Sequence, residues 1–152
     1  MDSCRVLVLN GPNLNLLGVR EPSIYGSESY EAMVTQLNAR ATQLNTALTC
    51  LQSNHEGVLI DHLHEAMNWA SGVVLNPGAY GHTSIALRDA ILATSLPTVE
   101  VHLSNIMARE PFRHKSLMSD VCIGIVSGFG VYGYELALMA LMRHLSQAAL
   151  DS

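Results

Sequence analysis

Charged residues are scarce in this chain of 152 residues, where they make up 14% of the sequence. An average soluble domain contains roughly 25%. The net charge is −5, and Lys115 is the one lysine. Because no basic stripe is present, the chain lacks the electrostatic footprint of nucleic-acid binding, and we expect no such partner. So little surface charge indicates subunit contacts over much of the exterior, and a monomer with a Ser, Thr and Asn surface remains the alternative.

Long apolar runs and paired cysteines are also missing. The sequence contains no apolar run of about 18 residues and no signal-peptide pattern, which predicts a cytoplasmic protein without a membrane partner. Cys4, Cys50 and Cys122 form an odd set without CxxC or metal spacing, as expected for buried, reduced thiols. His62 and His64 stand two residues apart, which points them to different faces of a helix. We therefore predict no metal site.

Short apolar runs alternate with longer helical patterns, and the length indicates a single domain over residues 1–152. The patterns predict strands over residues 6–9, 49–53, 72–75, 98–103 and 121–127, and helices over 29–48, 56–69, 83–94 and 134–147. Such alternation is typical of right-handed βαβ units, which give a parallel sheet with helices on both faces. The predicted fold class is α/β, a flavodoxin-like three-layer sandwich with strand order 2-1-3-4-5.

Polar side chains gather where three of these strands end. The first strand is followed by Asn13, Arg20 and Tyr25, the third by Asn76, Gly78 and His82, and the fourth carries or precedes Glu100, His102, Ser104, Arg109 and Arg113. In open α/β sheets, ligands bind outside the carboxyl ends of the strands. The convergence of reactive side chains at that edge predicts an enzyme.

The loop over residues 10–26 is too rich in Gly, Pro and Asn to form a regular element. It presents a cation, Arg20, beside a phenol, Tyr25, which indicates a working loop; a plain surface turn is the alternative. Gly18 and Gly26 bracket residues 19–26 as plausible hinges. We expect this segment to close over a bound ligand.

Two features favour other functions and are weaker. Residues 128–133 read G-F-G-V-Y-G and match the dinucleotide fingerprint, but no later strand remains to carry the ribose-binding acid. We interpret these glycines, and the neighbouring Tyr132 and Tyr134, as packing of the last helix against the sheet. An FMN carrier would need a Ser/Thr-rich phosphate loop after the first strand, where this chain has G-P-N-L. A non-catalytic assembly protein would not need Tyr25, Arg20 and His102 together.

Three long motifs carry a resemblance to a known family. They read G-P-N-L-N-L-L-G-x-R-E-P-x-x-Y-G over residues 11–26, N-P-G-A-Y-x-H-T-S-I-A-L-R-D-A over 76–90, and V-E-V-H-L-S-N-I-x-A-R-E-x-F-R-H over 99–114. In these motifs the chain resembles type II 3-dehydroquinate dehydratase. The departures are Met107, Pro111 and the pair Leu117 and Met118, none of which is assigned to the chemistry.

The resemblance implies dehydration of 3-dehydroquinate to 3-dehydroshikimate through an enolate, without a metal or an organic cofactor. It also implies a flavodoxin-like fold and a homododecamer built from trimers. The reaction serves the shikimate pathway and aromatic amino-acid biosynthesis, and the same step in quinate catabolism is the alternative. A lysine imine route is disfavoured because Lys115, the one lysine, lies outside the motifs.

The resemblance also implies roles for single residues. Tyr25 is the base, supported by the charge of Arg20, and His102 is the acid, held by Glu100 two residues earlier on the same side of the strand. Asn13 stabilises the enolate oxygen, in one version through a water. Substrate contacts are expected from Asn76, Gly78, His82, Leu103, Ser104 and Arg113, with Asp89 reaching the site of a neighbouring subunit.

Overall fold

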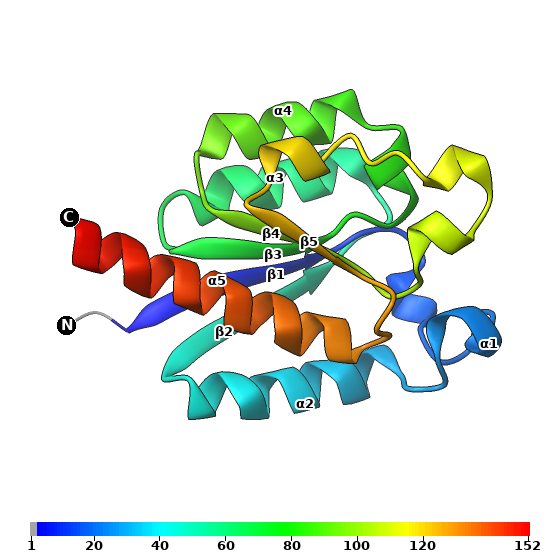
Figure 1. The fold of residues 1–152 in the computed structure, drawn as a ribbon, viewed down its shortest axis with the longest axis horizontal. Helices are drawn as coiled ribbons and strands as arrows, with labels where there is room; N and C mark the ends of the chain where they lie inside the picture. Colours follow the sequence, from blue (N-terminus) through cyan, green and yellow to red (C-terminus); the bar gives the residue numbers. More distant parts are fainter. Residues whose placement is uncertain (1–2) are drawn as a thin grey trace.

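The sheet has the predicted order. The computed structural model describes residues 3–152. Its five strands are all parallel and lie in the order β2-β1-β3-β4-β5, as Figure 1 shows. The strands are β1 (Cys4–Asn10), β2 (Thr46–Gln52), β3 (Gly72–Asn76), β4 (Thr98–His102) and β5 (Gly124–Ser127). The flavodoxin-like α/β architecture predicted from the alternating pattern is therefore confirmed.

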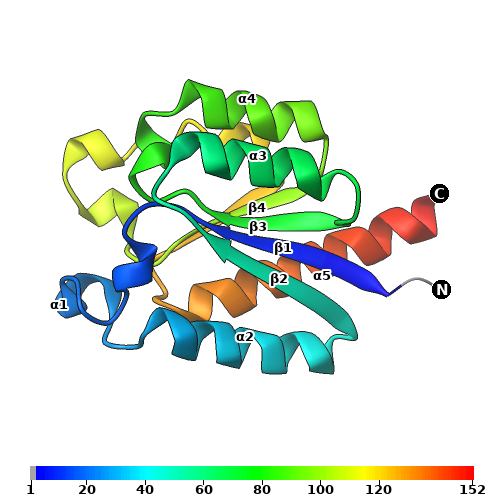
Figure 2. The same cartoon turned by 180° about the vertical axis from the view of Figure 1, so that it is seen from behind.

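Helices cover both faces of the sheet and complete three layers. One face carries α2 (Tyr30–Gln43) and α5 (Tyr132–Asp151), and the other carries α3 (Glu56–Ala66) and α4 (Ile85–Thr94) (Figures 1 and 2). The shorter helical segments are α1 (Pro22–Tyr25), η1 (Leu14–Leu16), η2 (Gly78–His82), η3 (Ile106–Ala108), η4 (Pro111–Arg113) and η5 (Ser119–Val121). All of these short segments except η5, which precedes β5, supply residues to the pocket at the carboxyl end of the sheet.

Strand β1 shows how the sequence builds the core. Val6 and Val8 pack toward α2 and α5, whereas Leu7 and Leu9 pack toward α3 and α4, and all four have no exposed surface. An unbroken apolar run is typical of a central parallel strand buried on both faces. Burial of each such side chain contributes about 1.5–3 kcal/mol, which fixes the frame that holds the site.

Several element boundaries differ from the sequence predictions. The helix predicted over residues 29–48 ends at Gln43. Leu48 lies instead in β2, where it pairs with Val6 of β1. The spacing of Leu44 and Leu48 imitates another helical turn, but Asn45 takes a left-handed φ of 53° and stops the helix. The predicted fifth strand begins three residues late, at Gly124, because Ser119–Val121 forms η5.

The glycines before α5 have two different roles. A Cβ on Gly133 would lie 3.2 Å from Cγ2 of Val101, so its prediction as a packing glycine is confirmed. That interpretation is wrong for Gly128 and Gly130, which have φ values of 101° and 60° that favour glycine in the turn after β5. Within residues 3–152, no helix combines the length and apolar character needed to cross a membrane.

Candidate active site

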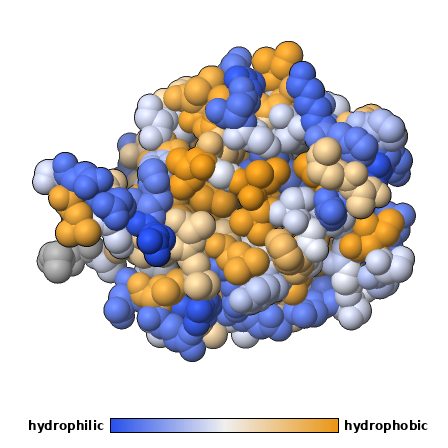
Figure 3. Space-filling model, viewed as in Figure 1, coloured by the Kyte–Doolittle hydropathy of each residue, from blue (hydrophilic) through white to orange (hydrophobic). Residues whose placement is uncertain are grey.

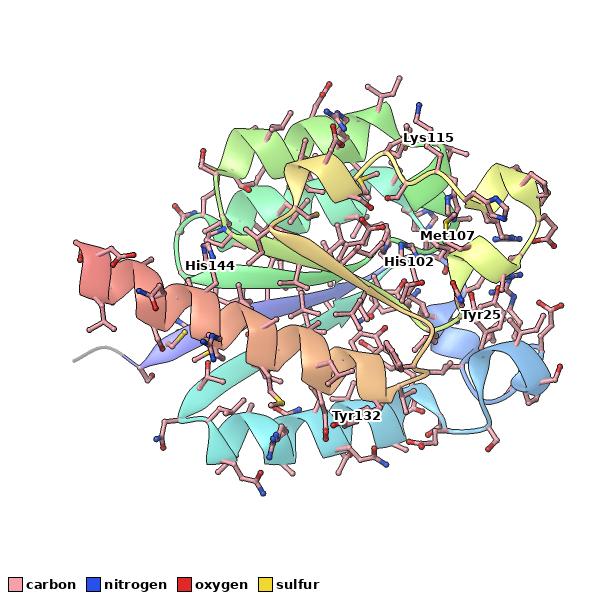
Figure 4. The ribbon with its side chains drawn as sticks, in the orientation of Figure 1. Tyr25, His102, Met107, Lys115, Tyr132 and His144 are labelled. Carbon is pink, nitrogen blue, oxygen red and sulfur yellow. The ribbon has the colours of Figure 1, made fainter. Side chains whose placement is uncertain are left out.

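A small polar pocket lies at the carboxyl ends of β1, β3 and β4. Its volume is about 80 Å³, and it contains all the site residues predicted from the sequence except Glu100 and Asp89: Asn13, Arg20, Tyr25, Asn76, Gly78, His82, His102, Leu103, Ser104 and Arg113. A wider cleft of about 950 Å³ lies between residues 21–28 and 128–132. Figure 4 shows Tyr25 and His102 at this end of the sheet.

The Tyr25 phenol faces two guanidinium groups. Arg109 donates a hydrogen bond of 2.7 Å to the phenolic oxygen, and the guanidinium carbon of Arg20 lies 4.6 Å from the ring centroid. The Arg109 side chain is 13% exposed, so water screens its charge poorly. Two cations beside one phenol stabilise negative charge on its oxygen. Sequence analysis named Arg109 after the fourth strand but gave it no role, because nothing local shows that its side chain reaches residue 25.

His102 is the last residue of β4 and forms a hydrogen bond through Nε2 with Oε2 of Glu100. Glu100 has no exposed surface and also accepts hydrogen bonds from Ser116 and Ser119. Burial by itself would raise the pKa of Glu100, but the hydrogen bonds from His102 and the two serines outweigh it and hold the pKa below its usual range. The result is a buried carboxylate that binds Nε2 at the edge of the His102 ring.

The remaining pocket residues have fixed surroundings. The His82 ring stacks on His102 with centroids 5.9 Å apart, and its Nδ1 lies 2.9 Å from the Lys115 carbonyl oxygen. The Arg113 Nε donates to Glu110 at 2.8 Å. Asn13 has a left-handed φ of 69°, and its backbone N–H donates to Asn54 at 3.0 Å. Asn13 also lines the pocket.

A buried hydrogen-bond chain orients Asn76. Its Nδ2 donates to the Tyr134 hydroxyl at 3.0 Å, its Oδ1 accepts from the Gly78 N–H at 3.1 Å, and the Tyr134 hydroxyl donates to Asn10 at 2.5 Å. Burial raises the pKa of Tyr134 far above its usual value, so the hydroxyl keeps its proton. Tyr134 packs in the core, as predicted, and it also sets the direction of a pocket amide.

Replacing Tyr134 by phenylalanine should destabilise the fold and raise KM for the pocket ligand. The change removes the partner of Asn76 Nδ2 and of Asn10 Oδ1, and loss of a partner at a buried polar atom costs about 1–3 kcal/mol. Thermal unfolding should show a fall in Tm of several degrees. Tyr132→Phe is the control, because the Tyr132 side chain is 55% exposed. Equal Tm and KM values in both variants would contradict this role.

Asp89 lies outside the pocket of its own chain. It is exposed on α4, where Ile85 and Leu92 are 65% and 53% exposed. The expectation that Asp89 contributes to a neighbouring subunit's site therefore stays a prediction.

The cysteines are unpaired and partly buried. Burial raises the pKa of Cys50 to about 11 and, together with the nearby charges of Glu100 and Asp120, that of Cys122 to about 12. Such thiols are poor nucleophiles and poor metal ligands at neutral pH. Within residues 3–152, no cluster of three or more His, Cys, Asp or Glu side chains is arranged to hold a metal ion.

The fold and the pocket together define an α/β protein of flavodoxin-like fold with a small pocket, at the carboxyl end of the sheet, that holds a phenol, two imidazoles and three guanidinium groups. The profile of the family described as Dehydroquinase class II matches residues 4–142. The chain belongs to this class II dehydroquinase family.

Individual relatives agree over nearly the whole chain. A 3-dehydroquinate dehydratase from Exiguobacterium sp. is 57% identical over 140 residues, which cover 92% of this chain and 95% of the relative. One from Gloeothece citriformis is 53% identical over 145 residues, 95% of each chain. The crystal structure of the type II dehydroquinase from Butyrivibrio crossotus has a TM-score of 0.90 at 48% identity and covers 91% of this chain and 97% of that one.

Proposed function

We propose that this chain is a hydro-lyase that removes water from 3-dehydroquinate to give 3-dehydroshikimate, with residues 1–152 acting as one catalytic domain. The observation that carries the proposal is the Tyr25 phenol, bonded to Arg109 and covered by Arg20, in the same small pocket as the Glu100-bound His102. These groups provide a base with charge support and an acid. The relatives named 3-dehydroquinate dehydratase support this reaction.

Tyr25 acts as the base in the first step. Its phenolate removes a proton from the carbon next to the ketone, and the electron pair moves onto the ketone oxygen to form an enolate. Arg20 and Arg109 stabilise the phenolate before the transfer. Asn13 lines the pocket. Its side-chain amide stabilises the enolate oxygen, directly or through a water.

His102 acts as the acid in the second step. The enolate collapses, the bond between carbon and the tertiary hydroxyl breaks, and His102 gives that oxygen a proton so that it leaves as water. The Glu100 carboxylate stabilises the charged imidazole before it donates. After the product leaves, Tyr25 gives up the proton that it took from the substrate and His102 takes up a proton, so both groups return to their starting forms without a cofactor.

The other pocket residues bind the substrate. Asn76, His82 and Arg113 contact its hydroxyl groups, and the backbone N–H groups of Leu103 and Ser104, with the Ser104 hydroxyl, bind its carboxylate. The Gly78 N–H is already bonded to Asn76, so Gly78 shapes the wall instead. A Cβ at Gly78 would lie 3.2 Å from the Pro12 carbonyl oxygen.

The test of the proposed function is to mix purified protein with 3-dehydroquinate and follow the ultraviolet absorbance of the conjugated product. Growth of this absorbance supports the reaction, and its absence with folded protein contradicts it. A yellow protein would instead favour the FMN alternative. Growth of a deletion strain on quinate, compared with growth without aromatic amino acids, separates quinate catabolism from the shikimate pathway.

We place this enzyme in the cytoplasm as a homo-oligomer, a dodecamer built from trimers. Low charge and exposed apolar side chains support self-association. Figure 3 shows apolar side chains gathered along β5 and α5, where Ile123 and Ile125 are each 44% exposed and Met139 is 39% exposed. Strand β5 is an edge strand of the sheet, and an exposed apolar edge favours pairing with another chain. Light scattering should give a mass that is a multiple of three chains.

Asp89→Asn should lower kcat about tenfold if Asp89 completes a neighbour's site, which corresponds to about 1.4 kcal/mol. The matched control is Asp61→Asn, because Asp61 is an exposed carboxylate on α3. Kinetics and light scattering on both variants separate lost chemistry from lost assembly. Wild-type kinetics in Asp89→Asn would remove this residue from the site.

A further inference from the structure

The Glu100 carboxylate is a fully buried charge behind the pocket wall. A carboxylate that has lost its water needs hydrogen-bond donors in return, since an unpartnered buried charge is strongly unfavourable. His102 supplies one donor. The Ser116 hydroxyl lies 2.7 Å from Oε2, and the Ser119 hydroxyl lies 2.7 Å from Oε1. Each carboxylate oxygen therefore has a serine donor of its own.

The directions of these hydrogen bonds follow from their partners. An ionised carboxylate can only accept, so both hydroxyls and Nε2 of His102 donate to Glu100. The Ser116 oxygen also accepts from the Met118 N–H at 3.1 Å, which turns its proton toward Glu100. With Nε2 engaged, the His102 ring has Nδ1 left for a ligand. The orientation of the acid thus depends on where the carboxylate is held.

Separate contacts anchor the segment that carries the two serines. The Leu117 N–H donates to the Gly81 carbonyl at 2.7 Å. Arg88 donates to the Leu117 carbonyl at 2.8 Å and to Oδ2 of Asp120 at 3.0 Å. These contacts do not involve a serine hydroxyl, so removal of one hydroxyl leaves the backbone path in place. The effect of each hydroxyl on Glu100 can therefore be measured in a folded protein.

Other ionisable groups also face the pair. The His82 ring stacks on His102, and Arg20, Arg109 and Arg113 line the same pocket. Cys122 lies close enough for the charge of Glu100 to raise its pKa further beyond the effect of burial. None of these groups forms a hydrogen bond with the Glu100 oxygens, and among residues 3–152 only the two serines share those oxygens with His102.

We propose that Ser116 and Ser119 are positioning residues for the acid: their hydroxyls hold the Glu100 carboxylate where it binds Nε2 of His102 and so aim the imidazole into the pocket. Neither serine lines the pocket, so neither touches the ligand. The expected effect of the serines on kcat rests on the proposed function. Their expected effect on the NMR signal of His102 does not, so the two expectations can fail separately.

Ser119→Ala is the sharper variant, because the Ser116 oxygen also accepts the Met118 N–H. We expect kcat to fall about three- to tenfold in Ser119→Ala and about thirtyfold in the double variant with Ser116→Ala, while KM stays within about twofold. Ser119→Thr keeps the hydroxyl and should restore kcat. The matched control is Thr98→Val, which removes a buried β4 hydroxyl that bonds the Leu96 carbonyl instead of Glu100.

Proton NMR tests the same positioning of His102 without measuring catalysis. A ring N–H bonded to a carboxylate gives a downfield proton signal. If this signal disappears in His102→Gln, it is assigned to His102. This signal should shift and broaden in Ser119→Ala but not in Thr98→Val. A changed Tm with wild-type kcat and an unmoved signal would show that the serines only stabilise the fold and would overturn the proposal. If the wild-type protein leaves 3-dehydroquinate unchanged, the proposed function fails, and the NMR signal still decides the role of the serines.

Discussion

Replacing Tyr25 by phenylalanine should lower kcat by about a thousandfold, near the middle of the range for loss of a general acid or base. The change removes one oxygen, and that oxygen is the atom to which Arg109 donates at 2.7 Å. The ring keeps its contacts with the guanidinium groups of Arg20 and Arg109. We therefore expect KM to change much less than kcat, as for a group that acts on the reacting proton.

The ultraviolet assay of product formation measures this effect, with Tm as the check on folding. Tyr132→Phe removes the same oxygen from a tyrosine at the start of α5 and should retain wild-type turnover. If Tyr25→Phe still forms product at the wild-type rate, the proposed reaction stands, but the base must be another pocket residue. If Tyr25→Phe loses its folded structure as well as its activity, the experiment is repeated with Tyr25→Trp, which fills the space without a phenol.

Replacing Arg109 by leucine should lower kcat about a hundredfold, which corresponds to about 2.7 kcal/mol. A hydrogen bond to a charged group contributes about 1.5–3 kcal/mol, and Arg109 makes such a bond to the phenolic oxygen that becomes negative. Its side chain is 13% exposed, against 35% for Arg20, so its charge is the less screened of the two. We therefore expect Arg109 to matter at least as much as Arg20.

Arg109→Lys separates charge from geometry. One guanidinium nitrogen of Arg109 donates to the Tyr25 hydroxyl at 2.7 Å and to the Ser104 hydroxyl at 3.4 Å. A lysine keeps the charge but not the planar fork of donors, so kcat should fall between the wild-type and leucine values. Arg143→Leu, at an exposed arginine of α5, is the control. Equal turnover in wild type and Arg109→Leu would assign the support of the phenolate to Arg20 alone.

The errors of the sequence predictions occur where local periodicity competes with the tertiary structure. Leu44 and Leu48 have helical spacing, yet Leu48 belongs to β2, where it pairs with Val6 of β1 and packs partly buried against the core. The turn at Asn45 depends on a left-handed backbone that many residues disfavour and that apolar patterns do not report. Boundaries were thus less predictable than the order of the elements.

Within the site, too, contacts between residues close in sequence were predictable and contacts between distant residues were not. Glu100 and His102 were paired correctly on the same side of β4, because side chains two residues apart in a strand share a face. Arg109, Ser116, Ser119 and Tyr134 were given no role in the site. They reach Tyr25, Glu100 and Asn76 across 84, 16, 19 and 58 residues of chain. No periodic pattern connects residues at such separations.

The sequence alone therefore determined the parallel sheet, the edge that carries the site and the Glu100–His102 pair. Each of these follows from short-range periodicity and from the handedness of βαβ units, which local stereochemistry imposes. Only the tertiary structure decided which groups form hydrogen bonds with the phenol, the buried carboxylate and the Asn76 amide. The first two sets of contacts depend on the paths of the loops between β4 and β5, which carry Arg109, Ser116 and Ser119, and the third depends on the packing of α5, which carries Tyr134, against the sheet.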